Sequence, residues 1–327
     1  MASVSWARYL LAAAVVVVAV LLSPASSQGF SNTLKSITNP GFPCGQPYGR
    51  NGEPPSRRRV SCQIIFPNER NYNFYFNLVM GRAKPDTRDN QKPPTKDISD
   101  AICGASPISE HFLVTAAHCI DDKTKSVSAI TLGDIDLATD NERNSRPADY
   151  EIEVIFAHPE YEFAGSLQRH RAAQDETPIQ FNEVVFPYCV SDSPLAPGTV
   201  VTASGFGLYN ATSQPDHLLE ANLTVLAQAA CEATYLREGI EDSLRIRYPK
   251  LLKGSDIICA IDDVSDACQG DSGGPMYLRK GGKQYLGGIV SGGASCRGNF
   301  KSVLPGLYLS LAKHIDFIND SIFTPRI

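Results

Sequence analysis

The segment 266–275 holds a serine in a setting that suits nucleophilic chemistry. It reads Asp-Ala-Cys-Gln-Gly-Asp-Ser-Gly-Gly-Pro, so Ser272 lies between an acid and two glycines. A serine attacks a carbonyl only when a base takes its proton and N–H donors stabilise the oxyanion. We expect Gly270 and Ser272 to supply those donors and Asp271 to pair with a buried ammonium. A bare Gly-Asp-Ser-Gly is also a surface turn in many proteins, so the pattern needs a base to carry weight.

A candidate base lies upstream, in the motif Leu-Val-Thr-Ala-Ala-His-Cys at residues 113–119. A neutral imidazole has an unperturbed pKa of about 6.5, so His118 could take the serine's proton and return it to a leaving amine. Taken alone, His118 is better explained as a histidine of the hydrophobic core than as a catalytic base. The two motifs occur in the order His118 then Ser272, and each contains a cysteine. Together they indicate acyl transfer.

Both motifs resemble those of the chymotrypsin and trypsin-like serine proteases. The resemblance implies two six-stranded antiparallel β-barrels, with the site in the cleft between them, and a C-terminal helix. It implies peptide-bond hydrolysis in which Ser272 attacks and His118 acts as the base, with no cofactor and no metal. The acidic loop 133–149 could bind calcium, but we interpret it as a solvated surface loop.

Specificity is predicted by the residue six positions before the nucleophile, Asp266. Trypsin-like members carry a carboxylate there, at the base of the pocket that selects Arg or Lys, because another side chain would leave that charge unpaired. The resemblance also makes Ser291, Gly293 and Gly306 the walls of this pocket. Gly292 replaces the usual tryptophan, which predicts looser positioning of the substrate.

The resemblance further implies three disulfide bonds. They are Cys103 to Cys119, Cys231 to Cys259, and Cys268 to Cys296. Cys189 would then bond to an upstream cysteine, for which Cys44 and Cys62 both remain open. Nine cysteines leave one thiol over.

The third member of the triad is where the chain departs from the family. An aspartate-bearing apolar strand is expected before Pro178, but residues 168–174 read Gln-Arg-His-Arg-Ala-Ala-Gln, and Arg169 takes the aspartate's place. Loss of that acid lowers turnover by about four orders of magnitude. These residues can be encoded so that the next reading frame gives Asn-Asp-Ile-Ala-Leu-Leu, which suggests a reading-frame or splice error. Asp175 is a weak substitute.

The activation end is also irregular. Family members are cut after Arg or Lys, and the new terminus inserts its ammonium beside the acid that precedes the nucleophile. The nearest likeness to that terminus, Val-Met-Gly-Arg at 79–82, follows Leu78, which is not basic. A cut after Arg59 would expose Val60-Ser-Cys, which lacks the flexible glycines that favour insertion beside Asp271. We therefore divide the chain into residues 1–27, 28–78 and 79–327, the last being the protease domain.

The pro-region 28–78 is polar and holds two cysteines. Its segment 44–52, Cys-Gly-Gln-Pro-Tyr-Gly-Arg-Asn-Gly, resembles the opening of an arthropod clip domain. A clip domain needs six cysteines, so we favour a pro-segment without a core of its own.

The chain has the features of an exported protein. Arg8, an apolar run and then small residues predict a signal peptide over 1–27, and no other segment is a candidate membrane span. Asn210, Asn222 and Asn319 begin glycosylation sequons. A net charge of −5 gives no reason to expect nucleic acid. We expect a secreted, disulfide-bonded glycoprotein.

Short apolar stretches between turn signals favour antiparallel all-β structure. Strands are predicted at 112–117, 128–132, 150–155, 199–203, 221–226, 285–290 and 306–311, with helices at 229–237 and at the C-terminal end.

The sequence thus predicts a secreted trypsin-like serine endopeptidase, made as a zymogen, that cleaves protein substrates after Arg or Lys. Its expected partners are those substrates, an activating protease and protease inhibitors. One alternative is an impaired protease homologue that acts as a non-enzymatic binding partner or cofactor, which Arg169 favours. Another is a decoy for inhibitors.

Overall fold

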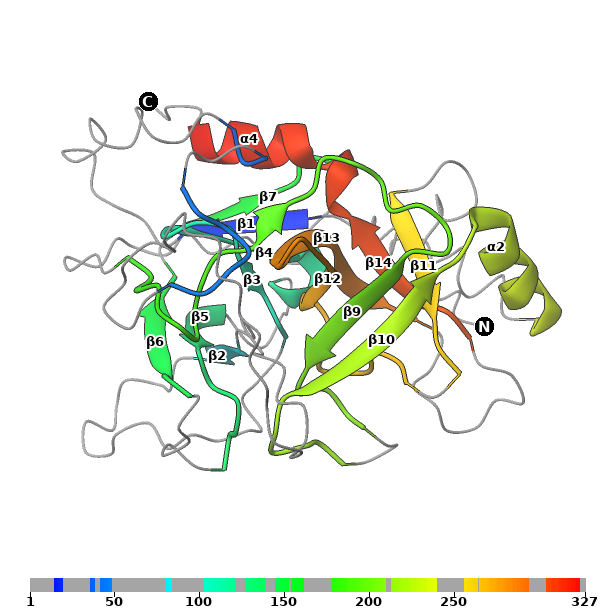
Figure 1. The fold of residues 1–327 in the computed structure, drawn as a ribbon, viewed down its shortest axis with the longest axis horizontal. Helices are drawn as coiled ribbons and strands as arrows, with labels where there is room; N and C mark the ends of the chain where they lie inside the picture. The colour runs from blue at the N-terminus through cyan, green and yellow to red at the C-terminus, as the bar shows by residue number, and fades with distance from the viewer. Residues whose placement is uncertain are drawn as a thin grey trace, which may run out of the picture.

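A computed structural model gives the fold (Figure 1). It describes residues 15–19, 36–38, 42–48, 80–83, 103–120, 127–138, 145–152, 154–161, 178–209, 213–239, 256–263, 265–293 and 304–323. The predictions that depend on Arg59, Val60, Arg169, Asp175 and Cys296 therefore concern residues outside the described ranges.

The C-terminal half forms a closed six-stranded barrel. Its strands follow the order β12-β9-β10-β11-β14-β13, and an additional β12–β13 pairing closes the ring. They are β9 (Val200–Gly205), β10 (Leu219–Val225), β11 (Ile257–Ile261), β12 (Pro275–Lys280), β13 (Lys283–Gly292) and β14 (Gly306–Ser310). The short β8 (Cys189–Val190) pairs in parallel with β13. Inward side chains of β10 are buried and its alternate residues are exposed, as expected of a barrel wall.

The N-terminal half consists of two sheets in the described residues. One has the order β3-β4-β1-β7 and the other β2-β5-β6. The first contains β3 (Ser106–Pro107), β4 (Phe112–Ala116), β1 (Val15–Ala19) and β7 (Val154–Ala157), and the second contains β2 (Met80–Ala83), β5 (Val127–Leu132) and β6 (Ala148–Glu151). Buried side chains from Leu113, Leu132, Ile152 and Phe186 belong to the core between them.

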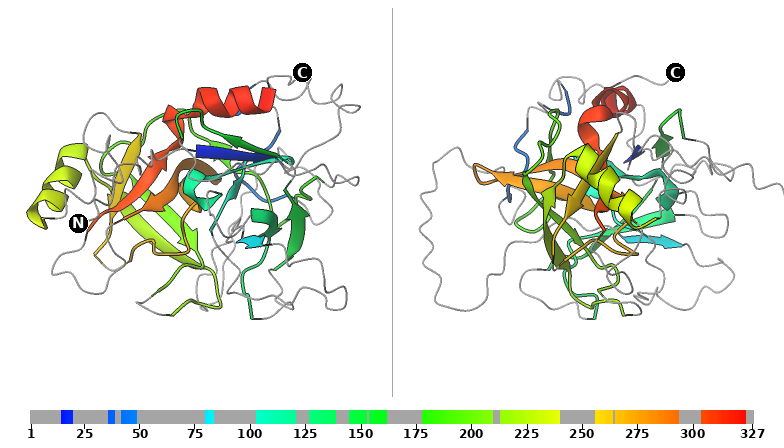
Figure 2. Two further views of the ribbon diagram at one scale, coloured as in Figure 1. Left: turned by 180° about the vertical axis from the view of Figure 1, so that it is seen from behind. Right: turned by 90° about the vertical axis from the view of Figure 1, so that its right-hand side faces the viewer.

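Two strands come from unexpected parts of the chain. Val15–Ala19, within the predicted signal peptide, lies in the sheet between β4 and β7, which both views from front and behind show (Figures 1 and 2). Met80–Ala83 pairs along its length with β5. Three of the four residues at 79–82 that resemble an activation terminus are therefore part of a paired strand. A free terminus would have to lie upstream of them.

Most predicted strands are confirmed, with shifted ends. The single strand predicted at 150–155 is wrong, because β6 ends at Glu151 and β7 begins at Val154, with buried Ile152 between them. Both predicted helices are present, as α2 (Gln228–Arg237) and α4 (Ile315–Phe323). Short 3-10 helices occur at η2 (Ala117–Cys119) and η3 (Leu311–Lys313). Among the described residues, no helix is long and apolar enough to cross a membrane.

Parts of the predicted pro-region are docked on the body of the protein. Gly45 donates its N–H to Pro187 O at 2.7 Å and accepts from Gln284 N at 2.7 Å. Tyr48 is buried against Phe181, and its N–H bonds to Asn182 O at 3.1 Å. The segment 42–48 thus contacts both halves and buries Cys44 and Tyr48.

Three disulfide bonds join described residues. They are Cys44–Cys189, Cys103–Cys119 and Cys231–Cys259, and the last two are the pairs that the family resemblance implies. The structure selects Cys44 over Cys62 for Cys189. Cys268 is also disulfide-bonded, but its expected partner lies outside the described residues.

Removing the Cys44–Cys189 bond should cost more stability than removing Cys231–Cys259. The first closes a loop with a sequence separation of 145, the second of 28. Chain entropy makes the longer cross-link worth about 1.5 kcal/mol more. We expect the double variant Cys44→Ala/Cys189→Ala to unfold at lower urea concentration than Cys231→Ala/Cys259→Ala, although the second pair is the more deeply buried. Equal midpoints would contradict this.

Candidate active site

The serine lies in a tight turn fixed by its own backbone. Asp271 N–H bonds to Cys268 O at 3.0 Å, and Gly274 N–H bonds to Asp271 O at 2.9 Å. Gly273 N–H then bonds to Val290 O at 2.7 Å, which ties the turn to β13. Gly270 has φ of 102°, a left-handed conformation that a side chain would strain. The sequence Gly270 to Gly274 therefore holds Ser272 on a rigid bend that leads into β12.

The serine turn is docked on the N-terminal half. Gly104 donates its N–H to Ser272 O at 2.7 Å. A Cβ on Gly273 would lie 2.3 Å from Gly104 O, 2.2 Å from Thr115 Oγ1 and 3.1 Å from Cys119 Sγ. Thr115 holds the other side of this contact, since its hydroxyl donates to Gly104 O at 2.7 Å. Only a glycine permits so close an approach between the two halves.

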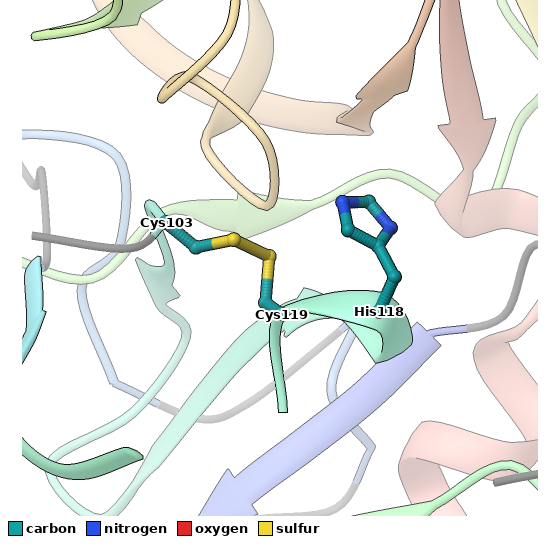
Figure 3. A group of neighbouring side chains, drawn as sticks. All are labelled: Cys103, His118 and Cys119. Atoms are coloured by element: carbon teal, nitrogen blue, oxygen red, sulfur yellow. A yellow bond between two sulfur atoms is a disulfide. The ribbon is translucent and has the colours of Figure 1, made fainter. Parts of the chain in front are cut away.

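His118 lies at the same contact. The fully buried strand β4 leads into η2, which carries His118 at its centre and Cys119 at its end. The reactive atoms of Cys103, His118 and Cys119 lie within 4.8 Å of one another. Figure 3 shows the imidazole and the bridge on the same side of η2. Since Cys119 Sγ also faces Gly273, the bridge places the histidine and serine motifs side by side.

This cluster does not have the chemistry of a metal site. Cysteine binds metal as a thiolate, and both sulfurs here are joined in a disulfide. His118 is partly exposed, which suits a group that exchanges protons with a bound molecule rather than one that fills a core.

Asp271 is a buried carboxylate that the sequence placed in a supporting role. It accepts N–H bonds from Gly207 at 2.7 Å and from Cys268 at 2.7 Å. Burial raises its pKa to about 6, and the bonds from Cys268 and Gly207 partly oppose that shift. A Cβ on Gly205 or Gly207 would meet its carboxylate at 1.8 Å or 2.5 Å. The pair Gly205 and Gly207 thus forms a cradle for Asp271.

The predicted pocket residues are partly brought together. Asp266 accepts the N–H of Ala267 at 2.8 Å, and a Cβ on Gly306 would lie 3.0 Å from its Oδ1. Gly293 lies next to Gly306, with 3.9 Å between a Cβ on Gly293 and the Gly306 Cα. Ser291 is buried on β13, which pairs with β14. Asp266 therefore faces Gly306 at the start of β14, and Gly306 in turn lies next to Gly293.

A cavity of about 190 Å³ lies beside the serine turn. Its lining includes Asp266, Asp271 and Glu220, together with apolar groups of Ala203, Leu208 and Ala221. Burial also raises the pKa of Glu220, against the lowering effects of Tyr277 and Arg279. The carboxyl groups of Asp266 and Asp271 favour a cationic occupant, whereas Glu220 is already paired with Arg279 at 3.1 Å.

The described carboxylates of the acidic loop 133–149 contact other protein groups. Asp136 lies 3.4 Å from His217 Nδ1, Asp134 accepts the N–H of Asp136 at 3.2 Å, and Asp149 accepts the hydroxyl of Thr131 at 2.5 Å.

The residues that support the site could not be identified from the sequence. Gly104 and Thr115 receive the serine turn, while Gly205 and Gly207 receive Asp271. Their only sequence signal is the spaced glycine pair in Ser204-Gly-Phe-Gly207 directly after an apolar run. Close backbone approach is a reason for glycine that periodicity does not reveal.

Comparison with known protein families shows to which one the chain belongs. The family model for trypsin matches residues 86–318, which contain both motifs and most of the two halves. The chain belongs to the trypsin family. The two-barrel, all-β fold and the relation to serine proteases follow from this membership, and the closed C-terminal barrel agrees with it.

Individual relatives include arthropod proteases. The chain is 32% identical over 239 residues to CLIP domain-containing serine protease B4 of Anopheles gambiae, covering 68% of this chain and 62% of that protein. It is 27% identical over 250 residues to Phenoloxidase-activating factor 3 of Holotrichia diomphalia, covering 71% and 67%. It is 27% identical over 313 residues to Ovochymase-2 of Mus musculus, covering 91% and 46%. The trypsin-family chain therefore spans less than two thirds of the first and last of these.

Replacing Gly273 with alanine should separate the serine turn from Gly104. The added methyl would overlap the Gly104 carbonyl and Thr115, at a φ of 78° that already disfavours alanine. Gly282→Ala is the matched control, since its φ is 75° and no atom lies within 4 Å of a Cβ there. We expect Gly282→Ala to cost about 1 kcal/mol and Gly273→Ala about 2 kcal/mol more, measured by urea unfolding. Equal losses would contradict the close contact.

The buried carboxyl of Asp271 should make stability fall as pH rises. Its pKa in the folded chain, about 6, lies above the ordinary value of 3.8, so the fold favours the neutral form. The stability is therefore full below about pH 4, falls by up to about 3 kcal/mol between pH 4 and 6, and is constant above. In the uncut chain, Asp271→Asn should remove this part of the slope in urea unfolding from pH 4 to 7. An unchanged slope would contradict it.

Proposed function

We propose that the chain is a secreted trypsin-like serine endopeptidase that cleaves after Arg or Lys and is made as a zymogen. The observation that carries the proposal is the docking of the serine turn on the histidine loop. The Gly104 N–H donates to the backbone carbonyl of Ser272, and Gly273 packs against Cys119, next to His118. Two chemically suited groups far apart in the sequence thereby share one contact between the halves.

In the proposed reaction His118 takes the proton of the Ser272 hydroxyl as its oxygen attacks the scissile carbonyl carbon. The N–H groups of Gly270 and Ser272 stabilise the oxyanion, for which the turn is already rigid. His118 then gives the proton to the leaving amine, and an acyl-enzyme remains. Water, deprotonated by His118, hydrolyses it and restores Ser272. No cofactor takes part.

Asp266 is proposed to select basic side chains. Gly306 packs directly against Asp266, and the space at Gly293, where a Cβ would meet only Gly306 at 3.9 Å, is proposed to admit a long substrate residue. Ser291 is proposed to line the same pocket. A carboxylate at the end of such a slot binds an ammonium or guanidinium and rejects groups that leave it unpaired.

Activation is proposed to follow a cut after Arg59. The strand Met80–Ala83 is held in a sheet, so the new terminus would be Val60. Its ammonium would suit the carboxylate-lined cavity at Asp271. The Cys44–Cys189 bond would then keep the cut pro-segment attached. The names of the relatives, a CLIP domain-containing protease and a phenoloxidase-activating factor, support a place in an extracellular cascade with an activating protease and inhibitors.

The competing function is a protease homologue that binds without turnover, as a cofactor or as a decoy for inhibitors. It is favoured by Arg169, a cation where an acid should orient the imidazole. A pure scaffold has no need of His118, Ser272 and Asp266 together, which favours the enzyme.

The chain as written should be labelled slowly at Ser272 by a serine-directed phosphonate after treatment with trypsin. Because Arg169 replaces the acid, turnover of an Arg ester should be about 10⁴-fold below that of an intact triad. Mass spectrometry would locate the label. Absence of label on Ser272 after cleavage at Arg59 would eliminate the enzyme and leave the homologue.

Three variants act as controls for this labelling. Ser272→Ala should abolish the label, and Arg59→Gln should leave the chain unlabelled after trypsin. Asp266→Ser should keep the label but lose turnover of the Arg ester, which separates the pocket from the nucleophile.

A further inference from the structure

Two glycosylation sequons lie among the described residues, and the fold places them in different surroundings. Asn222 and Thr224 are on β10, whereas Asn319 and Ser321 are on α4. The third sequon begins at Asn210, outside the described ranges. A glycan is bulky and needs a surface position, and the acceptor pattern requires the hydroxyl two residues after the asparagine. The surroundings of both groups therefore decide which sequon the folded protein can use.

On β10, Asn222 is placed to carry a bulky group. Asn222 and Thr224 are both exposed, while Leu223 between them is buried, because successive strand residues point to opposite faces. The Thr202 hydroxyl donates to Asn222 Oδ1 at 3.0 Å, which leaves Nδ2 on the opposite side of the carboxamide. Val200, which is 64% exposed, is the diagonal neighbour of Asn222 on the same face. A glycan on Nδ2 would therefore extend from the outer wall of the barrel, beside an exposed apolar side chain.

On α4, the carboxamide of Asn319 already holds another part of the chain. The Ile37 N–H donates to Asn319 Oδ1 at 3.0 Å. Ile37 is 1% exposed and belongs to the same core cluster as Ile318. Ser321 is buried, and its hydroxyl donates to Phe317 O at 2.8 Å within the helix. The hydroxyl of this sequon is thus hidden, and a glycan on Asn319 would lie against the docked segment at Ile37.

We propose that Asn222 carries an N-linked glycan in the secreted protein and that Asn319 carries none, because its carboxamide anchors the pro-segment at Ile37. In the transfer, Asn222 Nδ2 forms a bond to the anomeric carbon of an oligosaccharide on a lipid pyrophosphate. The bond from that carbon to the pyrophosphate oxygen breaks, the lipid pyrophosphate leaves, and Nδ2 gives one proton to a base of the transferase. The inference rests on the proposed secretion, because this donor belongs to the secretory pathway, and it is independent of protease activity.

Peptide mapping of the chain 1–327 from a eukaryotic secretory host tests the assignment. An amidase that removes N-glycans in heavy-oxygen water converts each glycosylated asparagine to a labelled aspartate, so each sequon is measured separately, Asn210 included. In protein from the medium, we expect label at Asn222 in most molecules and about tenfold less at Asn319, where the hydroxyl that completes the sequon is buried. Unlabelled Asn222 in that protein, or equal labelling of Asn222 and Asn319, would overturn the assignment.

Protein retained in the cells is mapped as well, which separates this inference from the proposed secretion. A chain that stays in the cells with label at Asn222 and not at Asn319 would support the assignment and contradict secretion. A retained chain with no glycan at any sequon would overturn both. A secreted chain with Asn222 unmodified would overturn the assignment alone.

A matched set of variants removes the hydroxyl of each sequon and keeps its asparagine. Thr224→Ala should lose one glycan from the intact mass, whereas Thr224→Ser should keep it, since either hydroxyl completes a sequon. Ser321→Ala should leave the number of glycans unchanged. Loss of a glycan in Ser321→Ala, or an unchanged mass of glycan in Thr224→Ala, would overturn the proposal.

Hydrogen exchange at Ile37 tests the anchor. Asn319→Ala removes the acceptor and should speed the exchange of the Ile37 amide about tenfold, because its hydrogen bond is lost. Asn319→Asp also removes the sequon but keeps an acceptor oxygen, so the protection should remain. Asn222→Ala, on β10, is the control that should not change it. Equal protection of Ile37 in Asn319→Ala and in the unchanged chain would overturn the assignment of Asn319 as the anchor.

Discussion

The structure depends on one close contact between its two halves, the backbone of the serine turn against Gly104. The hydrogen bond from Gly104 to Ser272 is possible only because Gly273 has no side chain to strike Thr115 and Cys119. Both partners are stiff: Val290 ties the turn to the barrel, and a disulfide ties Gly104's neighbour to η2. Two rigid pieces joined at one point fix the position of Ser272 relative to His118 more firmly than flexible loops could.

The same turn contains a buried carboxyl group, Asp271, whose ionisation costs free energy in the folded protein. A carboxylate in an apolar setting disfavours its own ionisation, and two backbone N–H groups offset only part of this. A buried charge that is incompletely satisfied is where an added ammonium has the largest effect. The cavity next to it is lined by further carboxyl groups. A new terminus that paired with Asp271 would therefore act directly on the serine turn, because Asp271 belongs to that turn.

The sequence was informative where chemistry or periodicity acts locally. The motifs around His118 and Ser272, most barrel strands and both helices could be predicted, because each has its own pattern. The break at Ile152 could not, since the alternation of apolar and polar residues continues through it. The cradle of Gly205 and Gly207 and the partner of Cys189 depend on distant residues brought together by folding. The strand β1 was missed because an apolar leader and a buried strand have the same composition.

The segment 168–174 is polar where the family resemblance calls for an apolar strand bearing an acid, and the sheet beside His118 takes an apolar strand from residues 15–19 instead. β4 is buried along its length, and the backbone N–H and C=O groups of a buried strand need partners. Val15–Ala19 can satisfy the backbone of these strands, but its valines and alanine carry no carboxylate. The backbone pairing of β4 and β7 depends only on an extended neighbouring strand, whereas the acid that orients a catalytic histidine depends on which residues that strand carries.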